Sequence, residues 1–194
     1  MTSSNAHYWE TRWVDRQTGW DIGYASTPIK AYFDQVGDRS KRILIPGCGN
    51  AWEGEYIYNL GFKNLHLIDI APTAVQRIQE RVPNLPAEHI LHGDFFDLEG
   101  SYDIIVEQTF FCALEPSRRM EYATKIHDLL APGGRLVGLL FDTEFGNDHP
   151  PYGGSKDEYL AYFEGLFDVQ VMERAYNSIP PRQGRELFIN LLHP

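Results

Sequence analysis

The chain has 194 residues, of which 43% are hydrophobic and 23% charged, and its formal net charge is −10 at pH 7. This length and composition fit one globular domain, spanning 1–194, that is large enough to bury its own core. The acidic balance argues against binding of a nucleic-acid backbone, no stretch approaches the roughly 18 apolar residues of a membrane span, and the first residues do not form a secretory signal, so we expect a cytoplasmic protein without membrane association.

The cysteine and histidine patterns predict neither disulfides nor a metal site. The two cysteines, Cys48 and Cys112, lie in apolar surroundings, which favours reduced thiols in the core over a disulfide framework. The seven histidines show no spacing typical of metal ligands.

Apolar runs alternate with helical patterns along the chain. Strands are expected at 42–46, 65–70, 89–94, 102–108, 135–141, 167–173 and 185–192, and helices at 51–60, 72–82, 116–130 and 155–166. Within the third helix, the apolar positions at helical spacing are Met120, Ala123, Ile126, Leu129 and Leu130. Apolar strands that alternate with helices predict a mostly parallel sheet covered on both faces.

In such a sheet, ligands bind at the carboxyl ends of the strands, near the point where the strand order switches. The residues just past the strands are therefore informative: Gly47–Gly49, Asp69, Asp94, Gln108 and Asp142. The segment 142–158, which follows the fifth strand, is a candidate lid because long loops in compact domains are often functional.

The first two strand ends point to a nucleoside without a pyrophosphate. Gly47-Cys48-Gly49 is followed by Trp52, where a dinucleotide-binding loop has Gly or Ala. Asp69 lies 20 residues after Gly49, where a carboxylate accepts the hydroxyls of a ribose. Retained ribose recognition with a poor pyrophosphate site predicts S-adenosylmethionine as the ligand.

Asp94 follows the third strand, in HGDFF. Its carboxylate, or the amides after it, is a candidate partner of the adenine amino group, with Phe95 or Phe96 against the ring. The alternative is that Asp94 caps the next turn.

Three of the four tryptophans, Trp9, Trp13 and Trp20, precede residue 21. Aromatic faces attract a sulfonium cation when water is excluded, so the cluster is a candidate cover for the cofactor. The alternative is that these rings pack the N-terminal segment onto the core.

Eight blocks of the sequence carry a family resemblance: WETRWVDRQTGWDIGYASTPI, LIPGCG, LIDIAPTAV, GDFFDL, FCALEP, LLAPGGRL, HPPYGGS and SIPPRQGRE. Their order resembles the thiopurine methyltransferase family, in particular its halide/thiol methyltransferase branch. The tryptophan segment together with FCALEP and PPY makes the resemblance specific, and it covers nearly the whole chain.

The resemblance implies a Rossmann-like, seven-stranded α/β methyltransferase fold with the last strand antiparallel and helices on both faces. It implies a monomer in which the N-terminal segment 1–25 closes over S-adenosylmethionine, with S-adenosylhomocysteine as the product. The expected cofactor contacts are Trp9, Trp13, Trp20, Gly47, Cys48, Gly49, Asp69, Ile70, Asp94, Phe95 and Gln108.

Methyl transfer is an in-line displacement, so we expect positioning catalysis without an obligatory acid, base or metal. The expected small-molecule acceptor is a soft nucleophile: a thiol, thiopurine, bisulfide, thiocyanate or halide. Candidate pocket residues are Trp20, Phe110, Phe111, Phe141, Tyr152 and Arg182. Halide-type members have Tyr at the place of Phe141, which weakens the case for halide or bisulfide.

Several alternatives stay open at this stage. Arg182 and Arg185 are candidates to attract an anion, and for Arg185 an ordinary surface charge is the alternative. Cys112 lacks an evident activating base, which argues against a methyl-carrying thiolate. The rival functions are methylation of a metalloid or selenium compound, non-catalytic cofactor binding, and a nicotinamide oxidoreductase, against which Trp52 counts.

Overall fold

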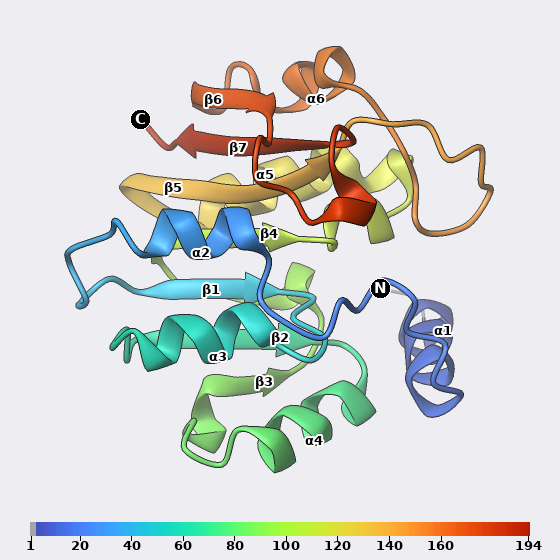
Figure 1. Cartoon of the computed structure of the whole chain (residues 1–194), viewed down its shortest axis with the longest axis vertical. Helices are drawn as coiled ribbons and strands as arrows, with labels where there is room; N and C mark the ends of the chain where they lie inside the picture. The colour runs from blue at the N-terminus through green and yellow to red at the C-terminus, as the bar shows by residue number, and fades with distance from the viewer. Residues whose placement is uncertain (1–2) are drawn as a thin grey trace.

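A seven-stranded sheet with the order β3-β2-β1-β4-β5-β7-β6 forms the centre of the molecule, a computed structural model that describes residues 3–194 (Figure 1). Its strands are β1 (Ile43–Pro46), β2 (Leu65–Asp69), β3 (Ile90–His92), β4 (Tyr102–Gln108), β5 (Leu130–Phe141), β6 (Asp168–Arg174) and β7 (Glu186–Leu192). β7 pairs antiparallel with both β5 and β6, and the other pairs are parallel. The predicted mostly parallel sheet with an antiparallel last strand is confirmed.

Helices cover both faces of this sheet, as predicted. The α-helices are α1 (Ser3–Val14), α2 (Thr27–Phe33), α3 (Trp52–Asn59), α4 (Pro72–Arg81), α5 (Arg119–Leu129) and α6 (Lys156–Phe163). Short 3-10 helices are η1 (Ala87–His89), η2 (Phe95–Asp97), η3 (Phe111–Ala113), η4 (Pro116–Arg118) and η5 (Pro180–Arg182). No helix in the described part of the chain is both long and apolar enough to cross a membrane.

Alternate side chains of β1 enter two separate cores. Ile43 and Ile45 join a cluster with residues of α2, α3 and α4, whereas Leu44 joins a cluster with residues of α5 and α6. This alternation is the two-residue periodicity of a strand that is buried on both faces. It explains why the strand is apolar throughout and why helices are needed on both sides.

The strand order switches direction at β1, which has β2 on one side and β4 on the other. The loops that follow β1, β2 and β4 therefore leave from the same edge of the sheet. α1 lies beyond this edge, at the right of Figure 1, where the long connection between β5 and α6 also runs.

Three local predictions need correction. The sequence pattern missed α2, a seven-residue helix that begins with Thr27-Pro28 and buries Ile29 and Phe33. The expected helix at 116–130 is a 3-10 turn followed by α5, and β5 begins at Leu130 rather than at 135, because Leu130 already pairs with Tyr102 across a register shift.

The buried face of α5 also differs from the periodicity. Met120, which was expected to be buried, is 49% exposed, whereas Tyr122 and Arg119 are fully buried side chains. Arg119 is stable there because its guanidinium pairs with Glu158 at 2.7 Å and donates to the Gly153 carbonyl at 2.8 Å. A buried ion pair across segments cannot be inferred from hydrophobic spacing alone.

The close contact between β4 and β5 depends on Gly138 of β5. A Cβ at this position would lie 2.1 Å from the Glu107 carbonyl oxygen and 2.5 Å from its Cβ. Gly138→Ala is therefore expected to lower the free energy of unfolding by about 1–3 kcal/mol, measured by urea denaturation. Gly37→Ala is the control, since no atom lies within 4 Å of its Cβ position. Equal stabilities of the two variants would show that the strands adjust without cost.

Candidate active site

The loops at the carboxyl edge of the sheet surround a cavity of about 480 Å³. Its walls come from the N-terminal segment, from the loops after the first five strands, and from the turn before β7. It brings together Trp9, Trp13, Trp20, Gly47, Gly49, Asp69, Ile70, Asp94, Phe95, Phe110, Phe141 and Arg182 from the residues that the sequence singled out. Segments far apart in the chain thus meet where the topology predicts a ligand site.

Four candidates lie outside the cavity lining. Phe111 is 1% exposed and packs against the rings of Tyr122 and Tyr159 in the core. The Gln108 amide oxygen lies 3.5 Å from the Ser26 hydroxyl. The Tyr152 hydroxyl lies 3.4 Å from the Asp148 carbonyl oxygen, and Cys48 packs against the cluster that contains α2, α3 and α4.

Two aromatic rings pack closely against Gly47 and Gly49, the glycines that follow β1. Gly47 and Gly49 both have positive φ angles, of 55° and 54°. A Cβ on Gly47 would lie 2.2 Å from the ring of Phe110, and one on Gly49 would lie 3.3 Å from the ring of Trp13. The loop therefore needs glycine for its backbone conformation and for the close approach of rings that line the cavity.

The Asp69 carboxylate joins the ends of two neighbouring strands. Oδ2 accepts the Gly49 N–H and Oδ1 accepts the Ala71 N–H, both at 2.9 Å. Burial raises the pKa of Asp69, and these hydrogen bonds oppose that shift. Because each carboxylate oxygen has a second lone pair, Asp69 can also accept hydroxyl groups of a ligand in the cavity.

Asp94 caps the next turn, the alternative that the sequence left open, and its second carboxylate oxygen remains without a partner among the described residues. Its Oδ1 accepts the Phe96 N–H at 2.9 Å and so caps η2. Its Oδ2 is buried and has no hydrogen-bond partner among the described residues. A buried acceptor without a partner is costly, so the open oxygen beside the cavity suits a ligand N–H group.

The N-terminal segment covers one side of the cavity with aromatic rings. Trp20 makes edge contacts with Trp9 and Trp13, at centroid distances of 5.5 and 5.9 Å. Glu10 holds α1 to the start of α4, because its carboxylate accepts the Thr73 N–H at 3.1 Å and the Thr73 hydroxyl at 2.6 Å.

Trp52, the residue that departs from the dinucleotide pattern, also attaches this segment. Its indole N–H donates to the Asp21 carboxylate at 2.7 Å, and the Asn50 amide donates to the same carboxylate. Asp21 follows Trp20 directly, so the loop after β1 holds the base of the tryptophan cluster. Asp21 was not singled out for this role from the sequence.

Arg182 and Arg185, which line the cavity from the turn before β7, have different surroundings. We call this side of the cavity, with Phe141 and Phe145, its far end. The Arg182 guanidinium donates to the Trp20 carbonyl at 2.8 Å and lies 3.4 Å from the buried Glu186 carboxylate, so its charge is compensated. Arg185 lies over the Phe145 ring at 5.4 Å and forms no ion pair with the described residues. Both arginines line the cavity, and Arg185 is exposed, as an ordinary surface charge would be.

Further lining residues were not singled out from the sequence: Asn5, Tyr8, Arg12, Thr109, Phe145 and His149. No motif marks them, since they come from α1 and from loops whose paths depend on the fold. Cys112 also lines the cavity, and burial, with Glu107 as a second cause, raises the pKa of its thiol to about 12. Among residues 3–194, no group of three or more His, Cys, Asp or Glu is arranged to hold a metal ion.

Comparison with known proteins identifies the family of the chain. The family model of thiopurine S-methyltransferase matches residues 4–189. A probable thiol methyltransferase 2 of Arabidopsis thaliana is 34% identical over 96% of this chain and 84% of its own length. Thiocyanate methyltransferase 1 of Brassica oleracea is 28% identical over 92% of this chain and 81% of its own length.

Solved structures show the same fold at low sequence identity. The N-methyltransferase NodS from Bradyrhizobium japonicum, in complex with S-adenosylhomocysteine, superimposes with a TM-score of 0.71 and 17% identity, over 98% of both chains. The match of the family model over nearly the whole chain means that the protein belongs to the thiopurine S-methyltransferase family and is an S-adenosylmethionine-dependent methyltransferase.

Proposed function

We propose that the protein methylates a small soft nucleophile, and that organic thiols are its preferred acceptors. When bound, S-adenosylmethionine supplies a methyl group on a cationic sulfur. The related proteins named as thiol and thiocyanate methyltransferases support a soft acceptor. The observation that carries the preference for an organic thiol is the composition of the far end of the cavity.

That end is apolar and aromatic. Phe141 and Phe145 meet edge to face at a centroid distance of 5.0 Å, and Pro150, Pro151 and Pro181 line the same cavity. Phe141 lacks a hydroxyl group that could donate a hydrogen bond to a small inorganic anion. An acceptor with an apolar body contacts more of this wall than bisulfide or a halide does. Arg185 lies at the same end, with its charge available to an anion.

The cofactor end fits the parts of S-adenosylmethionine. We assign the ribose hydroxyls to Asp69, the adenine amino group to Oδ2 of Asp94, and the adenine ring to the side of Phe95. We assign the methionine portion to the backbone of Gly47 and Gly49, which line the cavity. We assign the rings of Trp9, Trp13 and Trp20, which line the cavity, to the side of the sulfonium cation.

The chain contributes orientation and the exclusion of water rather than proton transfer. An acceptor that arrives as an anion needs no base, and Cys112, with a thiol pKa of about 12, stays protonated at neutral pH. Apolar walls remove water from the nucleophile, and the hydrogen bond from Arg182 to Trp20 joins the acceptor end to the N-terminal segment. Closure of residues 1–25 over the cofactor, a monomeric state and a cytoplasmic location stay predictions.

An acceptor panel tests the proposed reaction. Purified protein is incubated with S-adenosylmethionine and, separately, with thiophenol, a thiopurine, bisulfide, thiocyanate, iodide, selenide or arsenite, and S-adenosylhomocysteine is measured. We expect the highest kcat/KM with thiophenol or the thiopurine, because the aromatic wall contacts their rings. Turnover confined to arsenite or selenide, or no turnover with any thiol, would remove the proposal.

Asp94→Asn separates the capping oxygen from the ligand-binding one. Asn retains an oxygen for the Phe96 N–H but places an NH2 group where Oδ2 meets the adenine amino group. S-Adenosylhomocysteine affinity is expected to fall about tenfold by calorimetry, with little change in the melting temperature of the free protein. Asp97→Asn, at an exposed position of the same 3-10 turn, is the matched control. An unchanged affinity would mean that Asp94 serves only as a cap.

A further inference from the structure

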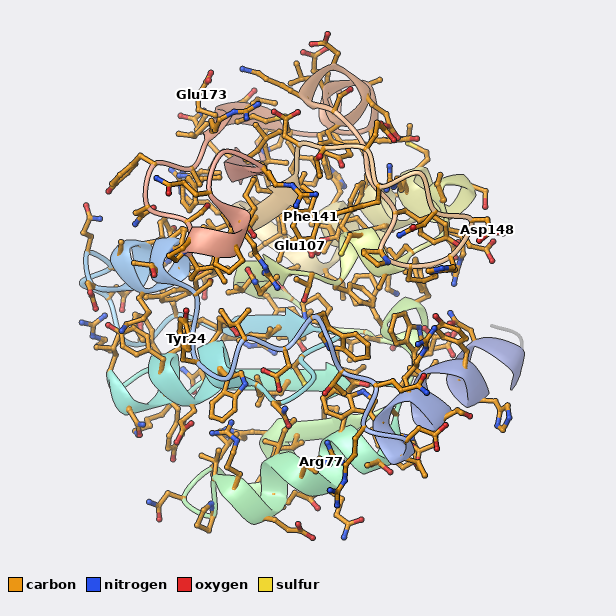
Figure 2. All side chains as sticks on the ribbon, turned by 45° about the vertical axis from the view of Figure 1, so that its right-hand side comes forward. Tyr24, Arg77, Glu107, Phe141, Asp148 and Glu173 are labelled. Atoms are coloured by element: carbon orange, nitrogen blue, oxygen red, sulfur yellow. The ribbon has the colours of Figure 1, made fainter. Side chains whose placement is uncertain are left out.

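Glu107 is a fully buried carboxylate that the methyl transfer itself does not use. It is the penultimate residue of β4, has 0% exposure, and does not line the cavity; Figure 2 labels it in the middle of the molecule. Its Oε1 accepts the backbone N–H groups of Phe110 and Phe111, both at 2.8 Å. Its Oε2 accepts the Tyr122 hydroxyl at 2.6 Å.

These hydrogen bonds hold the corner where the chain leaves β4. Thr109 has a φ angle of 60°, which is uncommon for a residue other than glycine, so the corner needs support from its surroundings. The corner sends Phe110 into the cavity wall and Phe111 into the core. Oε1 of Glu107 therefore holds the backbone of both Phe110, which lines the cavity, and Phe111, which is buried in the core.

Phe110 connects the corner to the cofactor end. Its ring lies directly on Gly47, where a Cβ would be only 2.2 Å away, and its centroid lies 5.3 Å from that of Phe95. A shift of the corner would therefore move the wall shared by the glycine loop and the proposed adenine site. On the other side of Glu107, the absence of a side chain on Gly138 lets β5 approach closely.

We propose that Glu107 is a positioning residue, which holds Phe110 against Gly47 through the amides of Phe110 and Phe111 and so sets the cavity wall in the geometry that methyl transfer requires. The proposal rests on the proposed function for its effect on turnover, but not for its effect on the backbone. Tyr122 has a supporting part, because it donates to the second carboxylate oxygen.

The surroundings of Glu107 make this role sensitive to pH. Burial raises the pKa of Glu107 to about 7, against the opposing effect of the Tyr122 hydroxyl and the two amides. The groups that face it are Tyr122 of α5, the Cys112 thiol of η3, and uncharged Gly138 of β5. Protonation below about pH 7 removes the charge that strengthens the two amide hydrogen bonds.

The test compares three variants of this cluster. Glu107→Leu removes both acceptor oxygens, Glu107→Gln keeps one oxygen for the two amides, and Tyr122→Phe removes only the hydroxyl. The control is Tyr102→Phe at the other end of β4, which also removes a buried tyrosine hydroxyl, one that lies 2.9 Å from His66 Nδ1. Melting temperatures first establish that each variant is folded.

Amide hydrogen exchange at Phe110 and Phe111, measured by NMR without ligand, is the primary readout. Exchange is expected to become faster by about tenfold or more in Glu107→Leu, by a smaller factor in Glu107→Gln, which keeps an acceptor oxygen but lacks the charge, and to remain near the wild-type rate in Tyr102→Phe. After correction for the intrinsic pH dependence of exchange, the wild-type rate is expected to approach that of Glu107→Gln below about pH 7, whereas the rate of Glu107→Gln is expected not to change.

Turnover is the second readout. Glu107→Leu is expected to lower kcat about 100-fold with a smaller change in KM, because misplacement of the wall affects the transition state most. Tyr122→Phe and Glu107→Gln are expected to lower kcat less, while Tyr102→Phe stays near wild type. If no acceptor is turned over, the exchange rates and the affinity for S-adenosylhomocysteine still decide the proposal.

Wild-type exchange at both amides in folded Glu107→Leu would overturn the proposal. An equal loss of kcat in Tyr102→Phe and Tyr122→Phe would also overturn it, since the loss would then follow from general destabilisation. If Glu107→Leu does not fold, Tyr122→Phe decides: unchanged exchange and unchanged kcat in this variant would contradict the role assigned to the pair.

Discussion

The buried Asp69 carboxylate is the contact on which the geometry of the site depends. It holds the amides of Gly49 and Ala71, and so joins the loop after β1 to the start of α4 at the point where the strand order switches. The free energy lost by burying a carboxylate, visible in its raised pKa, is partly offset by these amides. Asp69 lines the cavity, so its remaining lone pairs can accept the hydroxyl groups of the ribose that we propose to bind there.

The cover of the site is attached by polar contacts as well as by apolar packing, in which the buried Trp13 ring lies in one cluster with Ala71 and Ala74. Glu10 binds the first turn of α4, Asp21 binds Trp52, and Arg182 binds the Trp20 carbonyl. Each contact comes from a different part of the fold, so the tryptophan rings are positioned relative to the glycine loop, to α4 and to the acceptor end together. In the mechanism that we propose, such a cover aligns the cofactor with the acceptor without a residue that transfers protons.

Much of the fold and of the cofactor end could be predicted from the sequence. Apolar runs located the strands, and their ends located Gly47, Asp69 and Asp94, because the carboxyl ends of parallel strands meet at one edge of the sheet. The open oxygen of Asp94 reconciles its two interpretations, since the side chain caps a turn and also offers an acceptor to the cavity.

The acceptor end was harder to predict, for physical reasons. At the corner after β4, Thr109 adopts a left-handed conformation, and this turn decides that Phe110 lines the cavity while Phe111 is buried in the core. The two adjacent phenylalanines carry no signal of that difference. The different roles of Arg182 and Arg185 depend on the Glu186 carboxylate and the Trp20 carbonyl, which only the folded chain brings near.

The most direct test of the account is calorimetric titration of S-adenosylhomocysteine into the wild type and into Asp69→Ala. Asp103→Ala is the matched control, because Asp103 also accepts a backbone N–H, that of Arg42 at 2.8 Å, but does not line the cavity. Saturable binding is expected for the wild type and for Asp103→Ala, and no measurable binding for folded Asp69→Ala. Equal affinity of Asp69→Ala and the wild type would contradict the role assigned to Asp69.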